Sequence, residues 1–253
     1  MISSFNLDRL ELRYEPFPVG LARPVFSDDL YAELLSTYPP LDQFTTLDKV
    51  GTKYSLSEKY NAREYERWIQ EHAAWREFRA WVKSDSFIKY VLGVLRERSI
   101  DLGLKYEMGP ANRVFTRLRA LLRGGSALKV AKLSTRFEFS MLPAKGGCIL
   151  PHTDNSTKFV TLVVSMVGPL EWQAAYGGAT EINRPKDPAR IFNRVNNQLD
   201  FDDVETLDAF PFESNQALLF IRTFNSWHCV RPMTASDPDL MRRTLTINIE
   251  MPD

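Results

Sequence analysis

The chain has 253 residues, of which 44% are hydrophobic and 25% charged, and this composition excludes disorder as the dominant state. Lys and Arg together number 32 and so do Asp and Glu, so the formal net charge is zero and we do not expect nucleic acid as a partner. No run approaches the roughly 18 apolar residues of a membrane span, and the first residues do not resemble a secretion signal. We therefore expect no membrane association and a cytoplasmic protein, and two cysteines fit a reducing compartment. The sequence does not indicate an oligomeric state.

The first part of the chain predicts helices. One begins at Ser27, a suitable N-cap, and ends at Pro39 and Pro40. A second apolar stripe runs from Trp68 to Val82 with helical spacing, and His72 lies within it. A further helix follows Ser84. We interpret the large aromatic residues of these helices as core.

Residues 113–123 contain four arginines and no acid. They form either a solvated basic face or a docking surface for an anionic substrate or partner, and the sequence does not choose between these two.

From residue 128 onward the pattern changes to strands separated by Gly, Pro and Asn. The clearest strands lie at 129–142, 158–167, 216–223 and 242–251. Because no helical period separates them, they predict an antiparallel sandwich or barrel. We expect one domain, in which residues 1–127 form a helical support and residues 128–253 form the core. The polar excursion 183–215 is either a binding loop or a surface insertion.

The chain has only three histidines, His72, His152 and His228, so a histidine-dependent metal site must use most of them. His152 and Asp154 are two residues apart on extended chain and therefore project to the same side. His228 follows a strongly apolar strand. Two imidazoles and one carboxylate form the facial triad of non-haem Fe(II) oxygenases, which leaves positions open for a co-substrate and dioxygen. A structural zinc site normally needs four ligands, several of them thiolates, and no CxxC spacing is present.

The C-terminal strand RRTLTINIE predicts two different faces. Alternation places Arg242, Thr244, Thr246 and Asn248 on one side and apolar residues with Arg243 on the other. A guanidinium that points into a barrel suits a bidentate contact with a carboxylate, and we prefer Arg242 to Arg243 for this role.

These motifs, in this order, resemble one known family. HTD, a Gly-Gly turn in YGGAT, the segment WHCVRPM and an Arg before a Leu-Thr strand are similar to the prolyl-4-hydroxylase-like branch of the Fe(II)/2-oxoglutarate-dependent dioxygenases, over residues 130–251. The resemblance implies a mostly β fold with some α, a double-stranded β-helix (jelly roll) core braced by N-terminal helices. It implies Fe(II), 2-oxoglutarate and O2 as cofactor and co-substrates.

Residue by residue, the resemblance implies that His152, Asp154 and His228 hold the iron and that Arg242 binds the distal carboxylate of 2-oxoglutarate, with Thr244 nearby. A tyrosine often assists in this branch. The comparable positions here are Ser140 or Leu142 and Val164 or Ser165, and Thr161 is the candidate substitute.

The function implied is hydroxylation of a C–H bond in a small molecule or an amino-acid or peptidyl substrate, with 2-oxoglutarate converted to succinate and CO2. The acid Asp154 disfavours halogenation, because related halogenases have a small residue there. Two alternatives remain: a cupin-like metal dioxygenase that does not use 2-oxoglutarate, and a non-catalytic jelly-roll binding domain. Candidate substrate contacts are Arg136, Glu138, Arg184, Lys186 and Arg190.

Overall fold

The computed structural model describes residues 5–47, 52–102 and 133–251. Its helices and short 3-10 turns are α1 (Asp28–Ser36), η1 (Leu41–Gln43), α2 (Ala62–Glu71), α3 (Ala73–Val82), α4 (Asp85–Glu97), η3 (Ala174–Tyr176), η4 (Pro188–Arg190) and η5 (Phe201–Asp203). Its strands are β1 (Glu11–Arg13), β2 (Val19–Ala22), β3 (Thr45–Leu47), β4 (Lys53–Ser57), β5 (Ser134–Pro143), β6 (Ile149–His152), β7 (Lys158–Ser165), β8 (Thr180–Pro185), β9 (Val204–Phe210), β10 (Ala217–Ile221), β11 (His228–Val230) and β12 (Met241–Glu250).

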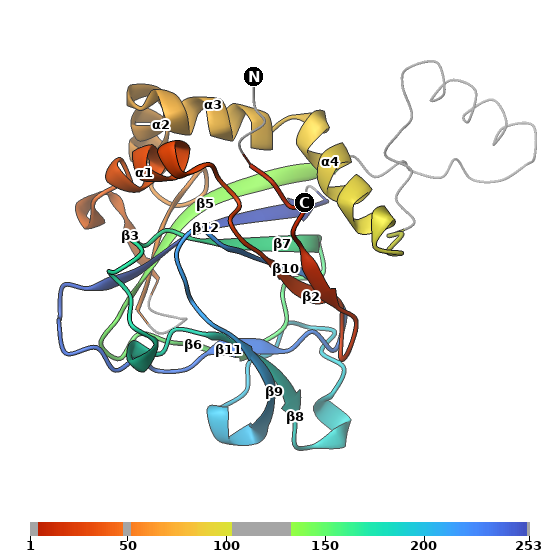
Figure 1. Ribbon diagram of the computed structural model, residues 1–253. Coiled ribbons are helices and arrows are strands. Elements are labelled where there is room, and N and C mark those ends of the chain that lie inside the picture. Colours follow the sequence, from red (N-terminus) through yellow and green to blue (C-terminus); the bar gives the residue numbers. More distant parts are fainter. Residues whose placement is uncertain (1–4, 48–51, 103–132, 252–253) are drawn as a thin grey trace, which may run out of the picture.

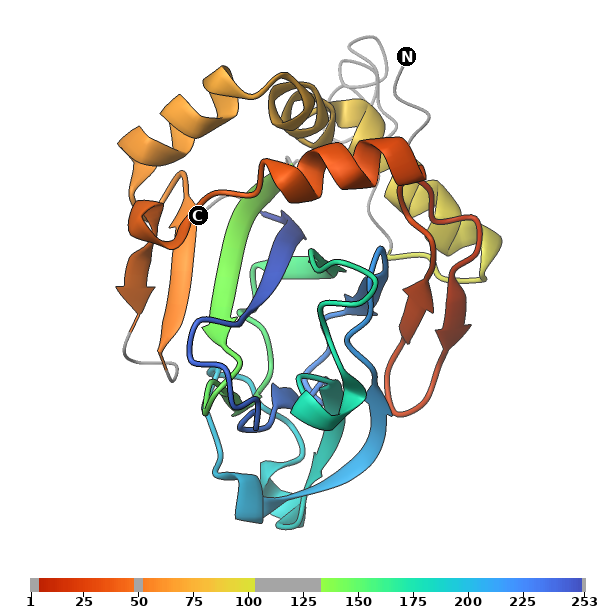
Figure 2. The ribbon, with the colours of Figure 1, turned by 60° about the vertical axis from the view of Figure 1, so that its left-hand side comes forward.

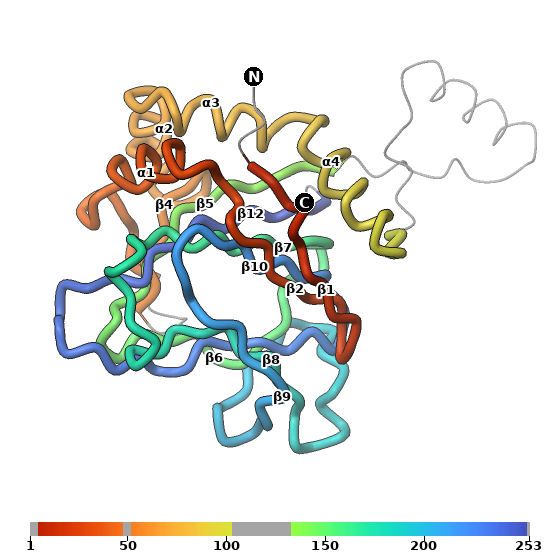
Figure 3. The backbone as a smooth tube through the Cα atoms, viewed as in Figure 1, coloured from red at the N-terminus to blue at the C-terminus, as the bar shows by residue number. Residues whose placement is uncertain are grey.

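Two antiparallel sheets form the core. The larger has eight strands in the order β1-β2-β10-β7-β12-β5-β4-β3, and the smaller has four in the order β6-β11-β8-β9. Helices α1 to α4 cover one face of the large sheet, and the small sheet lies on its other side (Figure 1). The backbone trace places β6, β8 and β9 together below β7, β10 and β12 (Figure 3). This arrangement is the predicted jelly roll braced by helices.

Strand β12 shows why the two faces of the large sheet differ. Leu245, Ile247 and Ile249 are fully buried in the main core, where they join apolar residues of the helices. Complete burial of such a side chain contributes about 1.5–3 kcal/mol. The alternate residues, from Arg242 to Asn248, face the small sheet instead, because successive side chains of a strand point to opposite faces. The alternation predicted from the sequence is confirmed.

The helices follow the predicted apolar stripes with one correction. The stripe from Trp68 to Val82 belongs to two helices, α2 and α3, separated at His72, which has an extended backbone (φ −115°, ψ 108°). The imidazole Nδ1 of His72 lies 2.9 Å from the carbonyl oxygen of Trp68, which a continuous helix would pair with the His72 amide. The side chain replaces that amide and the helix ends. Ser84 caps α4 by accepting a hydrogen bond from the amide of Phe87, as expected.

The N-terminal region is less purely helical than the sequence indicates. It also supplies two hairpins, β1–β2 and β3–β4, which extend the large sheet at its two flanks (Figure 2). These strands have three to five residues each, too few to show a reliable alternating pattern. Their pairing with β10 and β5 stabilises them.

The polar excursion also has structure that the pattern does not show. It contains the second half of β8 and all of β9, which pair with each other in the small sheet. The basic segment 113–123 lies outside the described residues, as does the start of the strand expected at 129. No helix in the part of the chain that the structure describes is long and apolar enough to cross a membrane.

Candidate metal centre

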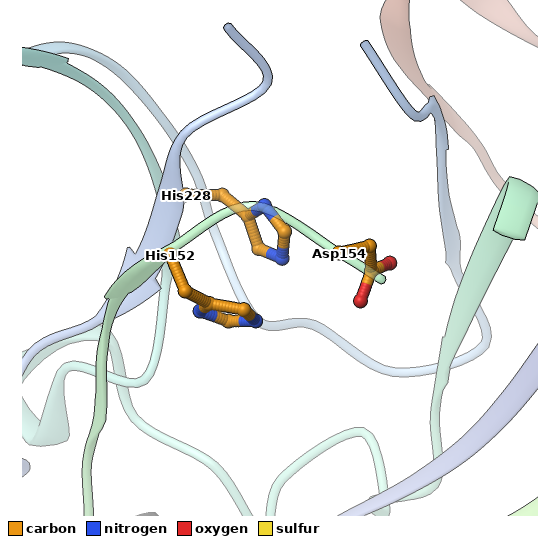
Figure 4. Close-up of side chains that lie close together, drawn as sticks. All are labelled: His152, Asp154 and His228. Carbon is orange, nitrogen blue, oxygen red and sulfur yellow. The ribbon is translucent and has the colours of Figure 1, made fainter. Parts of the chain in front are cut away.

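His152, Asp154 and His228 meet between the two sheets. His152 ends β6, Asp154 follows it before β7, and His228 begins β11, which pairs with β6 so that the two histidines are opposite each other. One ligand atom from each residue lies within 4.8 Å of the others. Their side chains converge on one space (Figure 4). It is the one such cluster of His, Cys, Asp and Glu found among the described residues.

The backbone fixes which nitrogen of each histidine is free. Nδ1 of His152 lies 2.8 Å from the carbonyl oxygen of Leu150, and Nδ1 of His228 lies 2.9 Å from that of Ser226. A carbonyl oxygen only accepts, so each Nδ1 carries the hydrogen. Each Nε2 therefore keeps its lone pair for a metal, the tautomer that metal-binding histidines adopt.

The Asp154 carboxylate has two partners of its own. Lys158 Nζ donates to Oδ1 at 2.6 Å, and the hydroxyl of Thr161 donates to Oδ2 at 2.7 Å. Thr161 Oγ1 also lies 2.9 Å from the side-chain amide of Asn248 on β12. Burial alone would raise the pKa of Asp154, but the ammonium group of Lys158, which also donates a hydrogen bond to it, holds it well below its usual range. The carboxylate is thus ionised and oriented.

Both imidazoles are neutral over a wide pH range. Desolvation, together with the neighbouring His228, lowers the pKa of His152 to about 3. Desolvation also lowers the pKa of His228, whose ring packs against Phe220 with 4.5 Å between centroids. Two neutral nitrogens and one carboxylate oxygen are a donor set that suits Fe(II), and three protein ligands leave coordination positions open. The residues therefore fit the ion that the sequence implied.

Arg242 is a buried cation beside this centre. Its side chain is 4% exposed, its Nε donates to the carbonyl oxygen of Gly178 at 2.8 Å, and its guanidinium lies 4.2 Å from the centroid of the Phe212 ring. Desolvation lowers its pKa to about 9. No carboxylate pairs with it among the described residues, whereas adjacent Arg243 forms an ion pair with Glu171 on the other face. A buried unpaired charge is costly, so this guanidinium is suited to an anionic ligand.

A small cavity lies beside Arg242. It is lined by Val163, Ser165, Thr180, Phe210, Pro211, Phe212, Gln216, Leu218 and Arg242. In the sheet register Val163 is opposite Leu218, and the next inward pair is Thr161 opposite Phe220. Those two residues touch Asp154 and His228. The cavity and the metal centre are therefore one row of side chains apart.

Some of the other predicted site residues line the cavity beside Arg242, and others do not. Thr244 lies on the inner face, but it is absent from the cavity lining, and its hydroxyl is 3.5 Å from the carbonyl oxygen of Ser140. Thr161 contacts Asp154 instead of the cavity. Of the positions comparable to the family tyrosine, Ser165 lines the cavity and Val164 is in the helix-side core.

The candidate substrate contacts are engaged with other protein groups. Arg136 pairs with Glu250 and Glu138 with Lys53. In the excursion, Arg184 pairs with Glu205, Arg190 with Asp187 and Asp203, and Lys186 donates to the carbonyl oxygen of Asp202.

Sequence reasoning did not identify Lys158, Phe220 or Arg222 as site residues. Lys158 is four residues after Asp154, and Phe220 and Arg222 follow Leu218 at the spacing of one strand face. The two-residue spacing of Leu218, Phe220 and Arg222 was the signal in the sequence that could have identified the last two as residues of the site face.

Comparison with solved structures finds similar folds at low sequence identity. A Pseudomonas putida prolyl-4-hydroxylase is 11% identical, with 93% of each chain covered and a TM-score of 0.44. A prolyl hydroxylase from Trichoplax adhaerens, in complex with a hypoxia inducible factor peptide fragment, is 13% identical, with 92% of this chain and 83% of that chain covered and a TM-score of 0.45. HygX from Streptomyces hygroscopicus, with nickel and 2-oxoglutarate bound, is 12% identical, with 92% and 82% covered and a TM-score of 0.41. No protein-family model and no curated protein matches the chain.

Proposed function

We propose that the protein is an Fe(II)/2-oxoglutarate-dependent dioxygenase that hydroxylates a C–H bond of a small molecule or an amino-acid residue. The observation that carries this proposal is the placement of the buried, unpaired Arg242 in the lining of a small cavity that lies one row of side chains from the His152, Asp154 and His228 cluster. A dicarboxylic keto acid needs these two elements: a metal for its keto-acid end and a cation for its distal carboxylate.

In this proposal His152, Asp154 and His228 hold Fe(II), and Arg242 binds the distal carboxylate of 2-oxoglutarate. When bound, iron would couple the reduction of O2 to the oxidation of both substrates: one oxygen atom enters succinate as 2-oxoglutarate loses CO2, and the other enters the C–H bond of the hydroxylated product. Ser165, Thr180 and Gln216 add polar groups to the wall of the Arg242 cavity.

The surrounding residues control geometry and water. Lys158 and Thr161 fix the Asp154 carboxylate, and the two backbone carbonyls at Leu150 and Ser226 fix the imidazole rings. Partners of this kind orient metal ligands and raise their affinity for the ion. Phe220 covers one face of His228 with an apolar ring and thereby excludes water there.

A cupin-like dioxygenase without 2-oxoglutarate would also use the three ligands, but it would leave Arg242 buried without a counterion among the described residues. In a non-catalytic jelly-roll domain, packing alone would give no reason for the three candidate ligands or for Arg242. A buried unpaired charge destabilises a fold unless a ligand compensates it.

The test is succinate formation by the protein supplied with Fe(II), 2-oxoglutarate and air, while candidate substrates are screened for a mass gain of one oxygen atom. His228→Ala should abolish succinate formation. Arg242→Gln should raise the 2-oxoglutarate concentration needed by about tenfold or more, because it removes a charge-assisted contact. Arg243→Gln is the matched control, since it changes the adjacent arginine on the opposite face of β12. Turnover without succinate, or an equal effect of both arginine changes, would contradict the proposal.

A further inference from the structure

A second arginine lies on the side of the metal centre opposite to Arg242. Along the inner face of β10, Leu218 lines the Arg242 cavity and Phe220 packs against His228. Arg222 is the next residue of this alternate series, just after the strand, and its amide continues the pairing by donating to the carbonyl oxygen of Phe159 at 3.0 Å. This row of side chains therefore runs from the Arg242 cavity, past the metal ligands, to Arg222.

Arg222 is held directly beside a candidate metal ligand. Its Nε donates to the main-chain carbonyl oxygen of Asp154 at 3.3 Å. The remaining guanidinium nitrogens form no ion pair with a carboxylate among the described residues. An anion bound by this guanidinium would lie close to the metal centre, near enough for the anion and the reacting carbon to belong to one small molecule.

Arg194 from the excursion joins Arg222 around an exposed aromatic ring. The guanidinium carbons of Arg222 and Arg194 lie 4.4 Å and 5.8 Å from the centroid of the Phe224 ring. The amide of Asn193 donates to the carbonyl oxygen of Phe224 at 2.7 Å and ties the two loops together. Arg194 forms no ion pair within the described ranges, in contrast to Arg184 and Arg190 of the same excursion.

Apolar side chains are exposed in the same two loops. Phe192, Val195 and Phe224 are 67%, 73% and 45% exposed. Hydrogen bonds anchor the backbone beneath them. Trp227 Nε1 donates to the carbonyl oxygen of Ile191 at 2.8 Å, and the amide of Leu199 donates to the carbonyl oxygen of Pro151 at 3.0 Å. Exposed apolar groups that gather beside unpaired cations mark a candidate interaction surface.

We propose that Arg222 and Arg194 bind a carboxylate of the primary substrate and that Phe224 and Phe192 contact an apolar part of the same molecule. The substrate class is a small apolar carboxylic acid, distinct from the 2-oxoglutarate that Arg242 binds. This inference rests on the proposed function, because it places the primary substrate at the same metal centre. Two arginines at opposite sides of the metal centre then separate the two acids, so that each carboxylate has its own cation.

The experiment uses the full chain loaded with Mn(II) and 2-oxoglutarate, and measures the paramagnetic relaxation of ligand protons by NMR. The probes are 4-phenylbutyrate, its uncharged amide 4-phenylbutyramide, and inorganic phosphate as a competitor. We expect the aromatic protons of the acid to relax strongly and those of the amide to show at least about tenfold weaker binding, since only the acid has a charge-assisted contact. Phosphate should compete weakly, because it has no apolar part.

The variants separate this inference from the proposed function. Arg222→Gln should weaken binding of 4-phenylbutyrate about tenfold or more while relaxation of the 2-oxoglutarate protons stays unchanged. Arg23→Gln, which changes an exposed arginine already paired with Glu213, is the matched control and should change neither signal. Equal binding of acid and amide, or unchanged acid binding in Arg222→Gln, overturns the inference even if 2-oxoglutarate binds. If the unaltered protein shows no relaxation of the 2-oxoglutarate protons but still binds 4-phenylbutyrate through Arg222, the proposed function is overturned instead.

Discussion

The ammonium group of Lys158 donates to Asp154 Oδ1 at 2.6 Å, and both side chains are largely withdrawn from solvent. The carboxylate of the candidate metal centre therefore has a cationic partner within the protein. Since both imidazoles are also held neutral, all three ligand groups already have the protonation state that a metal requires. The site is prepared electrostatically by the fold itself.

This preparation predicts that metal binding releases few protons. The pKa of His152 is lowered to about 3 and that of His228 is also lowered, so both protons are lost below the ordinary imidazole value of 6.5. At a pH equal to that ordinary value, two unperturbed histidines would together release about one proton on binding a metal. We expect well under half of this, measured as the dependence of the Mn(II) binding heat on the ionisation enthalpy of the buffer. Release of about one full proton would show that the imidazoles titrate normally.

Thr161→Val should weaken metal binding, because it removes the hydroxyl that donates to Asp154 and leaves Asn248 without that partner. Loss of such an outer contact typically costs about 10–100-fold in metal affinity. The measurement is Mn(II) affinity by calorimetry. Thr246→Val on the neighbouring strand is the control, since no hydrogen bond of its hydroxyl is found among the described residues. An unchanged affinity in Thr161→Val would mean that Lys158 alone positions the carboxylate.

Gly178→Ala should impair 2-oxoglutarate binding without loss of the metal. Gly178 has φ +81°, which L side chains rarely adopt, and an added Cβ would lie 2.8 Å from the Trp172 ring and 3.3 Å from Arg242 Cδ. The Gly178 carbonyl also accepts from Arg242 Nε. We expect 2-oxoglutarate affinity to fall about tenfold, with Mn(II) affinity unchanged. Gly93→Ala in helix α4, where an added Cβ meets nothing, is the control. Equal loss of both affinities would indicate a general folding defect.

The buried pair of Glu138 and Lys53 should make stability depend on acid pH. Burial alone would raise the pKa of Glu138, but Lys53 at 2.7 Å lowers it from 4.5 to about 2. Because the folded-state pKa is depressed, the contribution is present above the unfolded value of 4.5 and is lost as the pH falls toward 2. The difference corresponds to about 3 kcal/mol.

Urea unfolding of the unaltered protein and Glu138→Gln across that acid range measures this contribution. The variant should be less stable at neutral pH and should lose less stability on acidification. Glu205→Gln removes an exposed pair with Arg184 and should change little, since exposed ion pairs contribute about 0–1 kcal/mol. If the free energy of unfolding fell equally on acidification in the unaltered protein and in Glu138→Gln, Glu138 would not be the cause of the pH dependence.

The sequence predicted the parts of the molecule that depend on strong local patterns. The alternation of β12 distinguished Arg242 from Arg243, and the structure places the first in a cavity and the second in an ion pair. The HxD spacing and the apolar strand before His228 predicted that His152, Asp154 and His228 lie together, and their ligand atoms do lie together in the structure. These features need only strand geometry, which two-residue periodicity reveals.

Most of the remaining features depend on contacts between distant segments. The break at His72 is local, a side-chain contact with Trp68 that an apolar stripe does not reveal, whereas β1 to β4 are stabilised by the edges of other strands. Thr161 was assigned to the co-substrate, yet its hydroxyl contacts Asp154, because the register of β7 against β12 places it beside Asn248. Arg222 approaches Asp154 only once β10 and β7 pair. No local pattern contains that information.

The most direct test of the central claim is the visible absorption of the protein after anaerobic addition of Fe(II) and 2-oxoglutarate. We predict a charge-transfer band that requires both additions, is absent in His228→Ala, and in Arg242→Gln needs about tenfold more 2-oxoglutarate to reach half of its intensity. Arg243→Gln should give the same titration as the unaltered protein. If Fe(II) binds and no band develops at any 2-oxoglutarate concentration, the assignment of this site to a 2-oxoglutarate-dependent dioxygenase is contradicted.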